Sequence, residues 1–333
     1  MKFRLHAVAF GIALVIAGAF PATALADGLP TPGVYTDPEG IVALDGNEHY
    51  VTRSEKDDST LVRALSQSRR VLGSTTVSGR FVIPAVALDG SPGGLSADGT
   101  TLVLIQPRKR FPQRETHLAI LDAQSLLLRK RLTLHGDFSF DAISQDGSHI
   151  YLIQYLSPRD PTEYAVRAYD AVAETLLPEP IVDPDEESDE MRGYPLTRVA
   201  SPDGRWAYTL YDGGGKHPFV HALDTLKGRA VCIDLPGFAH QGHSANGWLR
   251  ISSDGAVLTL VHRREPTAVI DTETFKVSKP SDPRPTGQEV DSGDSGVAWS
   301  LIASGAVVAL AAVGGLSALR RRRSEQLAAG DAR

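Results

Sequence analysis

An Asp-Gly turn followed by an apolar strand recurs five times along this 333-residue chain, and this repeat constrains the fold more than any other feature. Four copies are clear: LSADGTTLVLIQ from Leu95, ISQDGSHIYLIQY from Ile143, ASPDGRWAYTLYD from Ala200 and ISSDGAVLTLVH from Ile251. A looser copy, VALDGNEHYVTR, begins at Val42. The steps between the turn aspartates are 53, 48, 57 and 51 residues. Units of this length that carry strands and no helical period predict an all-β array of structural repeats.

Each unit is predicted to contain four strands, a to d. Strand a leads into the Asp-Gly turn, where glycine supplies the positive φ that the turn requires, and strand b follows. Strand c ends in an apolar-Asp pair, and the aspartate can hold the tight turn into strand d. These pairs are Leu121-Asp122, Tyr169-Asp170, Leu223-Asp224 and Ile270-Asp271. Four strands in each of five units predict an all-β β-propeller of about five blades over residues 41–280.

The first repeat departs from this plan. Leu65 lies near the place where the other repeats have the strand-c aspartate. The stretch from Arg69 to Gly94 is longer than a single strand d needs. We therefore expect an extra hairpin in this stretch.

The segment Tyr50-Val51-Thr52 resembles the Tyr-Val-Thr-Asn signature of the YVTN-type, WD-repeat-like β-propellers, with Arg53 in place of the asparagine. In three repeats a tyrosine lies five residues after the turn aspartate: Tyr50, Tyr151 and Tyr208. In the other two repeats this position is Val103 and Thr259. The resemblance implies the fold but no single function, because such propellers include surface proteins, lactonase-like enzymes and periplasmic binding proteins. No catalytic set of that family matches residues of this chain.

Both ends of the chain carry membrane signals. Residues 1–26 have a basic start, an apolar run and a small-residue cleavage site, which predicts an exported protein with a signal peptide; a retained membrane anchor is the alternative. Residues 297–319 are uncharged and long enough to form a transmembrane helix, and the basic tail 320–333 places the C-terminus in the cytoplasm. Residues 27–40 form an irregular entry segment and 281–296 a polar linker. The predicted location is the cell membrane, with a single pass and the propeller extracytoplasmic.

The exported part is acidic. Residues 27–296 hold 38 acidic and 27 basic residues, a formal net charge of −11. Such a field repels nucleic acid, so no nucleic-acid partner is expected. The single cysteine, Cys232, rules out an intramolecular disulfide.

The long connections fall on one predicted face of the propeller, formed by the b-c loops and the links from one blade to the next. Long loops on a rigid scaffold are where binding residues gather. One of these loops, PRKRFPQR, is a basic cluster in an acidic domain and is a candidate binding segment for an acidic partner or for lipid headgroups; a solvated loop is the alternative. Its basic residues are Arg108, Lys109, Arg110 and Arg114.

A second candidate binding segment holds His240 and His243, which are three residues apart. With a third ligand they could bind Zn²⁺, and His217 and His221 precede them, but two loop histidines do not predict a metal. The acidic run from Asp183 to Glu190 lacks the alternating ligands and the glycine of a calcium loop, which favours a solvated loop. No cofactor and no catalytic residue is predicted.

The sequence thus predicts a binding or interaction module at the cell surface, with a protein or small-molecule partner on the long-loop face. A lactonase-like or other hydrolase using the same face is the alternative, so the question of enzymatic activity stays open. A histidine together with carboxylates at the mouth of the central channel would favour the enzyme. A mouth lined by apolar and uncharged groups would favour binding.

Overall fold

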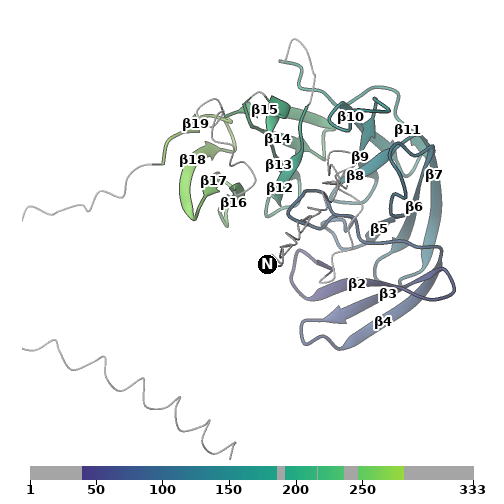
Figure 1. Ribbon diagram of the computed structural model, residues 1–333. Helices are drawn as coiled ribbons and strands as arrows, with labels where there is room; N and C mark the ends of the chain where they lie inside the picture. Colours follow the sequence, from purple (N-terminus) through teal and green to yellow (C-terminus); the bar gives the residue numbers. More distant parts are fainter. Residues whose placement is uncertain (1–39, 186–191, 216, 236–246, 281–333) are drawn as a thin grey trace, which may run out of the picture. The chain divides into compact units, whose positions relative to one another are not determined.

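The structure, a computed structural model, describes residues 40–185, 192–215, 217–235 and 247–280 (Figure 1). The chain divides into two compact units after Pro280, and all described residues belong to the first. The expected signal peptide, linker, transmembrane helix and tail lie outside the described residues. Within the described ranges, no helix is long and apolar enough to span a membrane.

Five antiparallel sheets follow one another along the chain, and in each of them successive strands are neighbours (Figure 1). The first sheet consists of β1 (Ile41–Val42), β2 (Glu48–Ser54), β3 (Ser59–Ser66) and β4 (Val71–Ser78). The second consists of β5 (Thr101–Ile105), β6 (Glu115–Asp122) and β7 (Leu128–His135). The third consists of β8 (Phe138–Ile143), β9 (His149–Tyr155), β10 (Tyr164–Asp170) and β11 (Thr175–Leu176). The fourth consists of β12 (Pro195–Ala200), β13 (Trp206–Tyr211), β14 (Phe219–Asp224) and β15 (Arg229–Asp234), with a short 3₁₀ turn, η1 (Gly213–Gly215), between β13 and β14. The fifth consists of β16 (Gly247–Ile251), β17 (Val257–His262), β18 (Glu265–Asp271) and β19 (Val277–Ser278).

This order confirms the predicted β-propeller with five blades. Four of the sheets have four strands, and the second has three. The missing inner strand of the second sheet is replaced by two isolated bridges to β5, Val82 with Ile105 and Leu95 with Leu102. The chain between these bridges leaves the sheet, so strand a of this blade is interrupted.

The predicted extra hairpin is the cause of that interruption. Ala85 and Pro92 pair with each other, and the Gly90 N–H donates to the Ala87 carbonyl at the tip. The N–H of Leu88 donates to the carbonyl of Pro195 in β12, 2.9 Å away. The hairpin therefore reaches from the second blade to the inner strand of the fourth.

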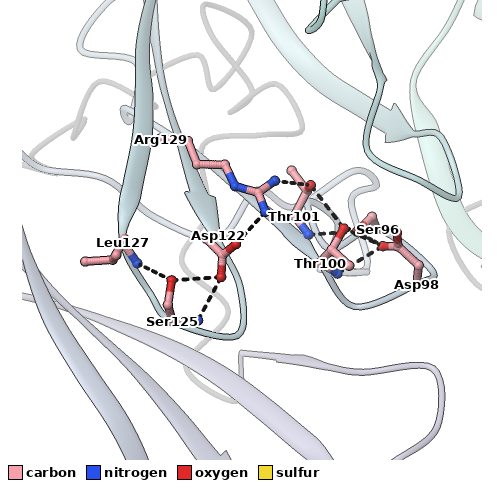
Figure 2. Close-up of polar contacts among 8 residues, drawn as sticks. All are labelled: Ser96, Asp98, Thr100, Thr101, Asp122, Ser125, Leu127 and Arg129. Carbon is pink, nitrogen blue, oxygen red and sulfur yellow. Dashed lines mark hydrogen bonds and ion pairs between the residues drawn. The ribbon is translucent and has the colours of Figure 1, made fainter.

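Four of the five Asp-Gly turns share one hydrogen-bond pattern, which Figure 2 shows for the second blade; the first turn has Ala43 in place of the serine. The Ser96 hydroxyl donates to Oδ1 of Asp98 over 2.6 Å and accepts the N–H of Thr101 over 2.9 Å. The same carboxylate oxygen accepts the N–H of Thr100. The turn glycines have φ of 69–75°, the left-handed region that glycine enters without steric cost. The serines of the Ser-x-Asp-Gly motif are thus used in building turns, as the sequence indicated.

The strand-c aspartates hold the c-d turns as predicted. Oδ1 of Asp122 accepts the N–H of Ser125 over 2.8 Å, and the Arg129 guanidinium joins this carboxylate to Thr101 (Figure 2). The other three carboxylates each accept N–H groups two and three residues further on; they are Asp170, Asp224 and Asp271. The a-b and c-d turns of a blade therefore lie at the same end of its sheet.

Consecutive sheets pack face to face through buried apolar clusters. The residue five positions after the turn aspartate faces the following sheet, and Tyr50, Val103, Tyr151 and Tyr208 are at most 1% exposed there. In the fifth sheet this position is Thr259, on the face opposite to Leu258 and Leu260, which pack on the fourth sheet. Among the described residues no apolar cluster joins the fifth sheet to the first. Of the two positions without tyrosine, Val103 is still buried against the following sheet, whereas Thr259 lies on a face that no other described blade covers through an apolar cluster.

Candidate functional site on the long-loop face

The b-c connections and the inter-blade links meet at the end of the sheets opposite to the Asp-Gly turns. Arg108, in the β5–β6 connection, contacts Asp137, in the link from β7 to β8. Asp160, in the β9–β10 connection, lies 3.7 Å from Arg192, in the link from β11 to β12. We call this end the long-loop face; its described segments are 106–114, 136–137, 156–163 and 192–194.

Asp137 is the anchor of the basic loop. Its Oδ1 accepts Nη2–H of Arg108 over 2.5 Å and Nε–H over 2.9 Å. Its Oδ2 accepts the backbone N–H of Gln113 over 2.9 Å. The two side chains of the ion pair are only 6% and 3% exposed. One buried carboxylate thus ties both ends of the segment from Arg108 to Gln113.

Thr116 adds a second attachment beside the first. Its hydroxyl donates to the Gly136 carbonyl over 3.0 Å and accepts the N–H of Phe138 over 2.9 Å. The side-chain amide of Gln113 also donates to this hydroxyl, over 3.0 Å. The loop is consequently fixed to the second and third blades by both charge and hydrogen bonds.

One aromatic ring of the basic loop and one of the third blade lie against the Arg108 side chain of the ion pair. The Arg108 guanidinium lies 4.9 Å from the ring centre of Tyr155 and 5.9 Å from that of Phe111, within the range of cation-π attraction. The two rings meet edge to face at 5.5 Å. Tyr164 and Tyr211 continue the row inward, and burial raises the pKa of both phenols. Half-buried rings at the surface and buried rings beneath give this face a rigid apolar base.

The remaining cations of the loop project from this base. Lys109, Arg110 and Arg114 are exposed. Arg108 is adjacent to them in the sequence, but its side chain is buried beneath the loop, where it pairs with Asp137. The structure therefore separates the four basic residues into one internal support and three outward charges.

A second polar centre lies between the third and fourth blades. A bulge in β8, between Phe140 and Ala142, turns Asp141 toward β12. Its Oδ1 pairs with Nη2 of Arg198, whose Nη1 donates to the Asp141 carbonyl over 2.9 Å. Asp141 is 2% exposed, and its Oδ2 has no hydrogen-bond partner among the described residues. A buried charge pair of this kind is costly to desolvate, so its presence is weak evidence of a stabilising role.

His221 belongs to the same centre. A cross-strand row on the fourth sheet runs from Arg198 through Thr209 and His221 to Cys232. His221 is 1% exposed, and neither ring nitrogen has a hydrogen-bond partner among the described residues. Burial lowers the pKa of its imidazole to about 4, so the ring is neutral at pH 7.

The structure does not test the predicted histidine pair. His240 and His243 lie outside the described residues, as does most of the acidic run. His217 lies 3.3 Å from Asp234, away from the buried His221. Within the described part of the chain, no group of three or more His, Cys, Asp or Glu side chains could hold a metal ion.

A cavity between the blades allows the two expected linings, that of an enzyme and that of a binding protein, to be compared. It lies among the first four blades and is lined mainly by apolar side chains together with Asp141 and Arg198. No histidine is among the described residues that line it. The lining therefore meets neither expectation in full, because it holds no described histidine but does hold the charged Asp141 and Arg198.

Sequence reasoning missed Asp137, Asp141 and Arg198. A signal for Asp137 does exist: Gly-x-Phe occurs at 79–81 and again at 136–138, at equivalent places in the first two repeats. Both phenylalanine N–H groups are accepted by a strand-c threonine, Thr60 in one repeat and Thr116 in the other. No comparable signal marks Asp141, because its position depends on a bulge.

Comparison with known proteins yields structural likeness alone. No protein-family model matches the chain, and no curated protein matches its sequence.

Several solved structures are similar to it at low identity. A functionally unknown protein from Desulfotomaculum acetoxidans has 13% identity and a TM-score of 0.44, with 74% of this chain and 73% of that one covered. The Swd1 β-propeller domain of Myceliophteria thermophila has 10% identity and a TM-score of 0.41, with coverage of 73% and 70%. TolB from Acinetobacter baumannii has 14% identity and a TM-score of 0.40; 77% of this chain is covered but only 55% of TolB. Likeness at this level carries no argument about function.

Proposed function

We propose that this chain is a membrane-anchored, extracytoplasmic β-propeller that acts as a binding module at the cell surface, and that its long-loop face binds an acidic protein partner. The observation that carries the proposal is the attachment of both ends of the basic loop to buried Asp137. A loop held in one conformation loses little entropy on binding, so its charges act with less penalty than those of a mobile loop.

The outward groups of the loop determine the partner's chemistry. Lys109, Arg110 and Arg114 supply three exposed positive charges, while Phe111 and Tyr155 offer half-buried rings beside them. Arginine and aromatic side chains are the groups that most often carry binding energy in protein interfaces. Carboxylates next to an apolar side chain would complement such a surface.

The acidic character of the rest of the domain limits the range of this attraction. With a net charge of −11 over residues 27–296, an acidic partner is repelled at long distance. Binding therefore depends on close contact with the basic loop, which favours a specific partner over any polyanion. Anchoring through residues 297–319 would hold this face near partners at the same membrane.

The first experiment measures peptide binding to the full chain in a neutral detergent. The probe is a fluorescein-labelled peptide of four glutamates around one phenylalanine, and the glutamine version of this peptide is the ligand control. The test variant is Lys109→Glu with Arg110→Glu. The matched control is Arg70→Glu with Lys227→Glu, which makes the same charge change at exposed c-d turns on the opposite face.

The proposal predicts that the acidic peptide binds the native chain and that the Lys109/Arg110 variant loses affinity by about tenfold or more, or ~1.4 kcal/mol. The control variant should keep its affinity. Equal losses in both variants would mean that net charge alone governs binding, and binding of the glutamine peptide with the same affinity would contradict an acidic partner.

A separate test addresses the anchoring. In intact cells, external protease should digest the propeller and leave the C-terminal tail protected. A chain found in the soluble fraction with residues 1–26 intact would contradict the proposed location.

A further inference from the structure

A cavity of about 280 Å³ opens among the first four blades at the end that carries the Asp-Gly turns. Val42, Val86, Phe140 and Trp206 form apolar parts of its wall, and Asp141 and Arg198 are its charged residues. This volume is near the lower end of the range of ligand pockets, roughly 300–1,000 Å³. The cavity thus has the size for a small molecule and lies apart from the long-loop face.

The inserted hairpin determines the direction of access. Its tip is bonded to the beginning of β12, where the N–H groups of Leu88 and Asp89 donate to the carbonyls of Pro195 and Leu196 over 2.9 and 3.1 Å. Strand β12 runs from the long-loop face toward its Asp-Gly turn, so the hairpin tip is attached at the long-loop end. Ala97 and Gly204, at two Asp-Gly turns, line the cavity at the other end. A ligand would enter between the turns.

The turns around this entrance pack closely. A Cβ on Gly204 would lie 2.3 Å from Cβ of Ala97 and 3.7 Å from Leu44 of the first blade. The Gln145 side chain donates to the Asp203 carbonyl over 2.6 Å and so joins the turns of the third and fourth blades. The entrance is therefore a built feature, with its turns held in contact.

Arg198 is the positively charged hydrogen-bond donor of the cavity. Its Nε–H donates to Thr209 over 2.5 Å, and its Nη1 and Nη2 each donate one hydrogen to Asp141. The second hydrogen on each terminal nitrogen has no acceptor among the described residues, and the side chain, 9% exposed, borders the cavity. These N–H groups are the hydrogen-bond donors available to a ligand.

The charge balance determines which ligands fit. Asp141 already neutralises Arg198. An anion would compete with this carboxylate for the guanidinium, and because Asp141 pairs with no other cation among the described residues, it would be left buried and uncompensated. A cation would face the guanidinium. A neutral molecule with a carbonyl-type acceptor would take a donor of Arg198 and leave the ion pair intact.

We propose that this cavity binds a small, uncharged, largely apolar molecule with one hydrogen-bond acceptor, such as a ketone or an ester. The acceptor bonds to Arg198, and the apolar part packs against Trp206, Phe140 and Val42. This site is independent of the proposed binding at the long-loop face, because it opens at the opposite end of the blades.

The test is a nuclear magnetic resonance titration of the full chain in detergent, followed through the side-chain indole signal of Trp206. Cyclohexanone is the principal probe. Methylcyclohexane, which lacks an acceptor, and cyclohexanecarboxylate, which is charged, are the comparison probes. Val42→Trp fills the cavity from an exposed position, and Val71→Trp makes the same change on β4 at a similarly exposed residue outside the cavity lining.

We expect cyclohexanone to shift the Trp206 signal in a saturable way, with an affinity about tenfold higher than that of either comparison probe. Val42→Trp should lose this binding at least about tenfold, and Val71→Trp should retain it. Equal affinity for methylcyclohexane would overturn the role of Arg198, and tighter binding of the carboxylate would overturn the neutral ligand class. A Trp206 signal unaffected by all three probes, or a response that Val42→Trp does not diminish, would overturn the site itself.

Discussion

Arg108 and Asp137 form in the second blade the ion pair that Asp58 and Arg80 form in the first, with the two charges exchanged. Asp58 and Arg108 both lie in b-c connections, and Arg80 and Asp137 are both the middle residue of a Gly-x-Phe segment. The environments differ. The first-blade pair has side chains 60% and 73% exposed, and the second-blade pair only 6% and 3%. One repeat position therefore carries an ordinary surface pair in one blade and a buried anchor in the next.

This difference predicts unequal costs of removal. Asp137→Ala leaves Arg108 buried without its counter-ion and frees the Gln113 N–H, so it should lower the free energy of unfolding by about 3–5 kcal/mol. Arg80→Ala removes the exposed partner and should cost under about 1 kcal/mol. Denaturant unfolding of the two variants, compared with the native chain, measures both values. Similar losses in the two would contradict the anchor role of Asp137.

The Asp-Gly turns allow a test of close packing with two glycines of equal conformation. Gly99 and Gly204 have φ of 69° and 73°. An added Cβ meets nothing within 4 Å at Gly99, whereas at Gly204 it meets Ala97 at 2.3 Å. Gly99→Ala should cost about 1–2 kcal/mol for its left-handed backbone. Gly204→Ala should cost a further 1–3 kcal/mol, approximately, for the overlap. Thermal or denaturant unfolding of both variants gives the difference, and equal destabilisation would mean that the turns are not in contact.

The serine of the Ser-x-Asp-Gly motif should control the acidity of the turn aspartate. The Ser144 hydroxyl, with the N–H and hydroxyl of Ser148, lowers the pKa of Asp146 to about 2. Because the folded-state pKa lies below the ordinary value of 3.8, this carboxylate contributes stability above about pH 4 that is lost as pH falls toward 2. Ser144→Ala should raise the pKa of Asp146 toward 3.8 and flatten the stability profile in this window.

Carboxyl carbon titration by nuclear magnetic resonance checks this result. Asp122 is an internal reference, since Ser125 in another blade lowers its pKa to about 2 and Ser144→Ala leaves that contact intact. An unchanged pKa at Asp146 would show that the hydroxyl does not determine the acidity of the turn.

His221 should limit stability in mild acid. Burial lowers the pKa of this histidine from 6.5 to about 4. The positive charge of Arg198 lowers this pKa as well, and the negative charges of Asp141 and Asp183 raise it by less. The unfolded chain therefore binds a proton between pH 6.5 and 4 while the folded chain does not. The corresponding stability is fully present above pH 6.5 and is lost as pH falls toward 4.

His221→Leu removes this titration. Because no hydrogen bond to the ring is lost among the described residues, the variant should be near native stability at pH 7.5. At pH 4.5 it should be more stable than the native chain, by up to about 3 kcal/mol. Unfolding midpoints across this range check the prediction. Parallel profiles for the two proteins would mean that His221 does not titrate on unfolding.

The blade plan could be predicted from the sequence because it rests on local chemistry. The turn aspartates, the turn glycines and the strand-c aspartates act on backbone groups within a few residues, so their spacing alone locates strands and turns. The extra hairpin was also foreseen, since a stretch ending at Gly94 was too long for one strand. Even the loss of tyrosine at Thr259 has a structural reason, since no other described blade covers that face through an apolar cluster.

The polar centres could not be predicted because they depend on contacts between distant segments. Asp141 and Arg198 are 57 residues apart, and a bulge in β8 turns the carboxylate toward its partner. Arg108 was grouped with Lys109 and Arg110 because sequence shows charge but not burial. Only the position of Asp137, 29 residues away, distinguishes the internal arginine from its exposed neighbours.

The central claim is that the long-loop face is the surface that binds an acidic partner. Hydrogen-deuterium exchange of the full chain, with and without the four-glutamate peptide, tests it most directly because it locates the contact. The account predicts slower exchange in residues 106–116 and 156–163, with the Asp-Gly turns unchanged. Protection centred on the turns at residues 96–100 and 201–205, with none in the basic loop, would contradict it.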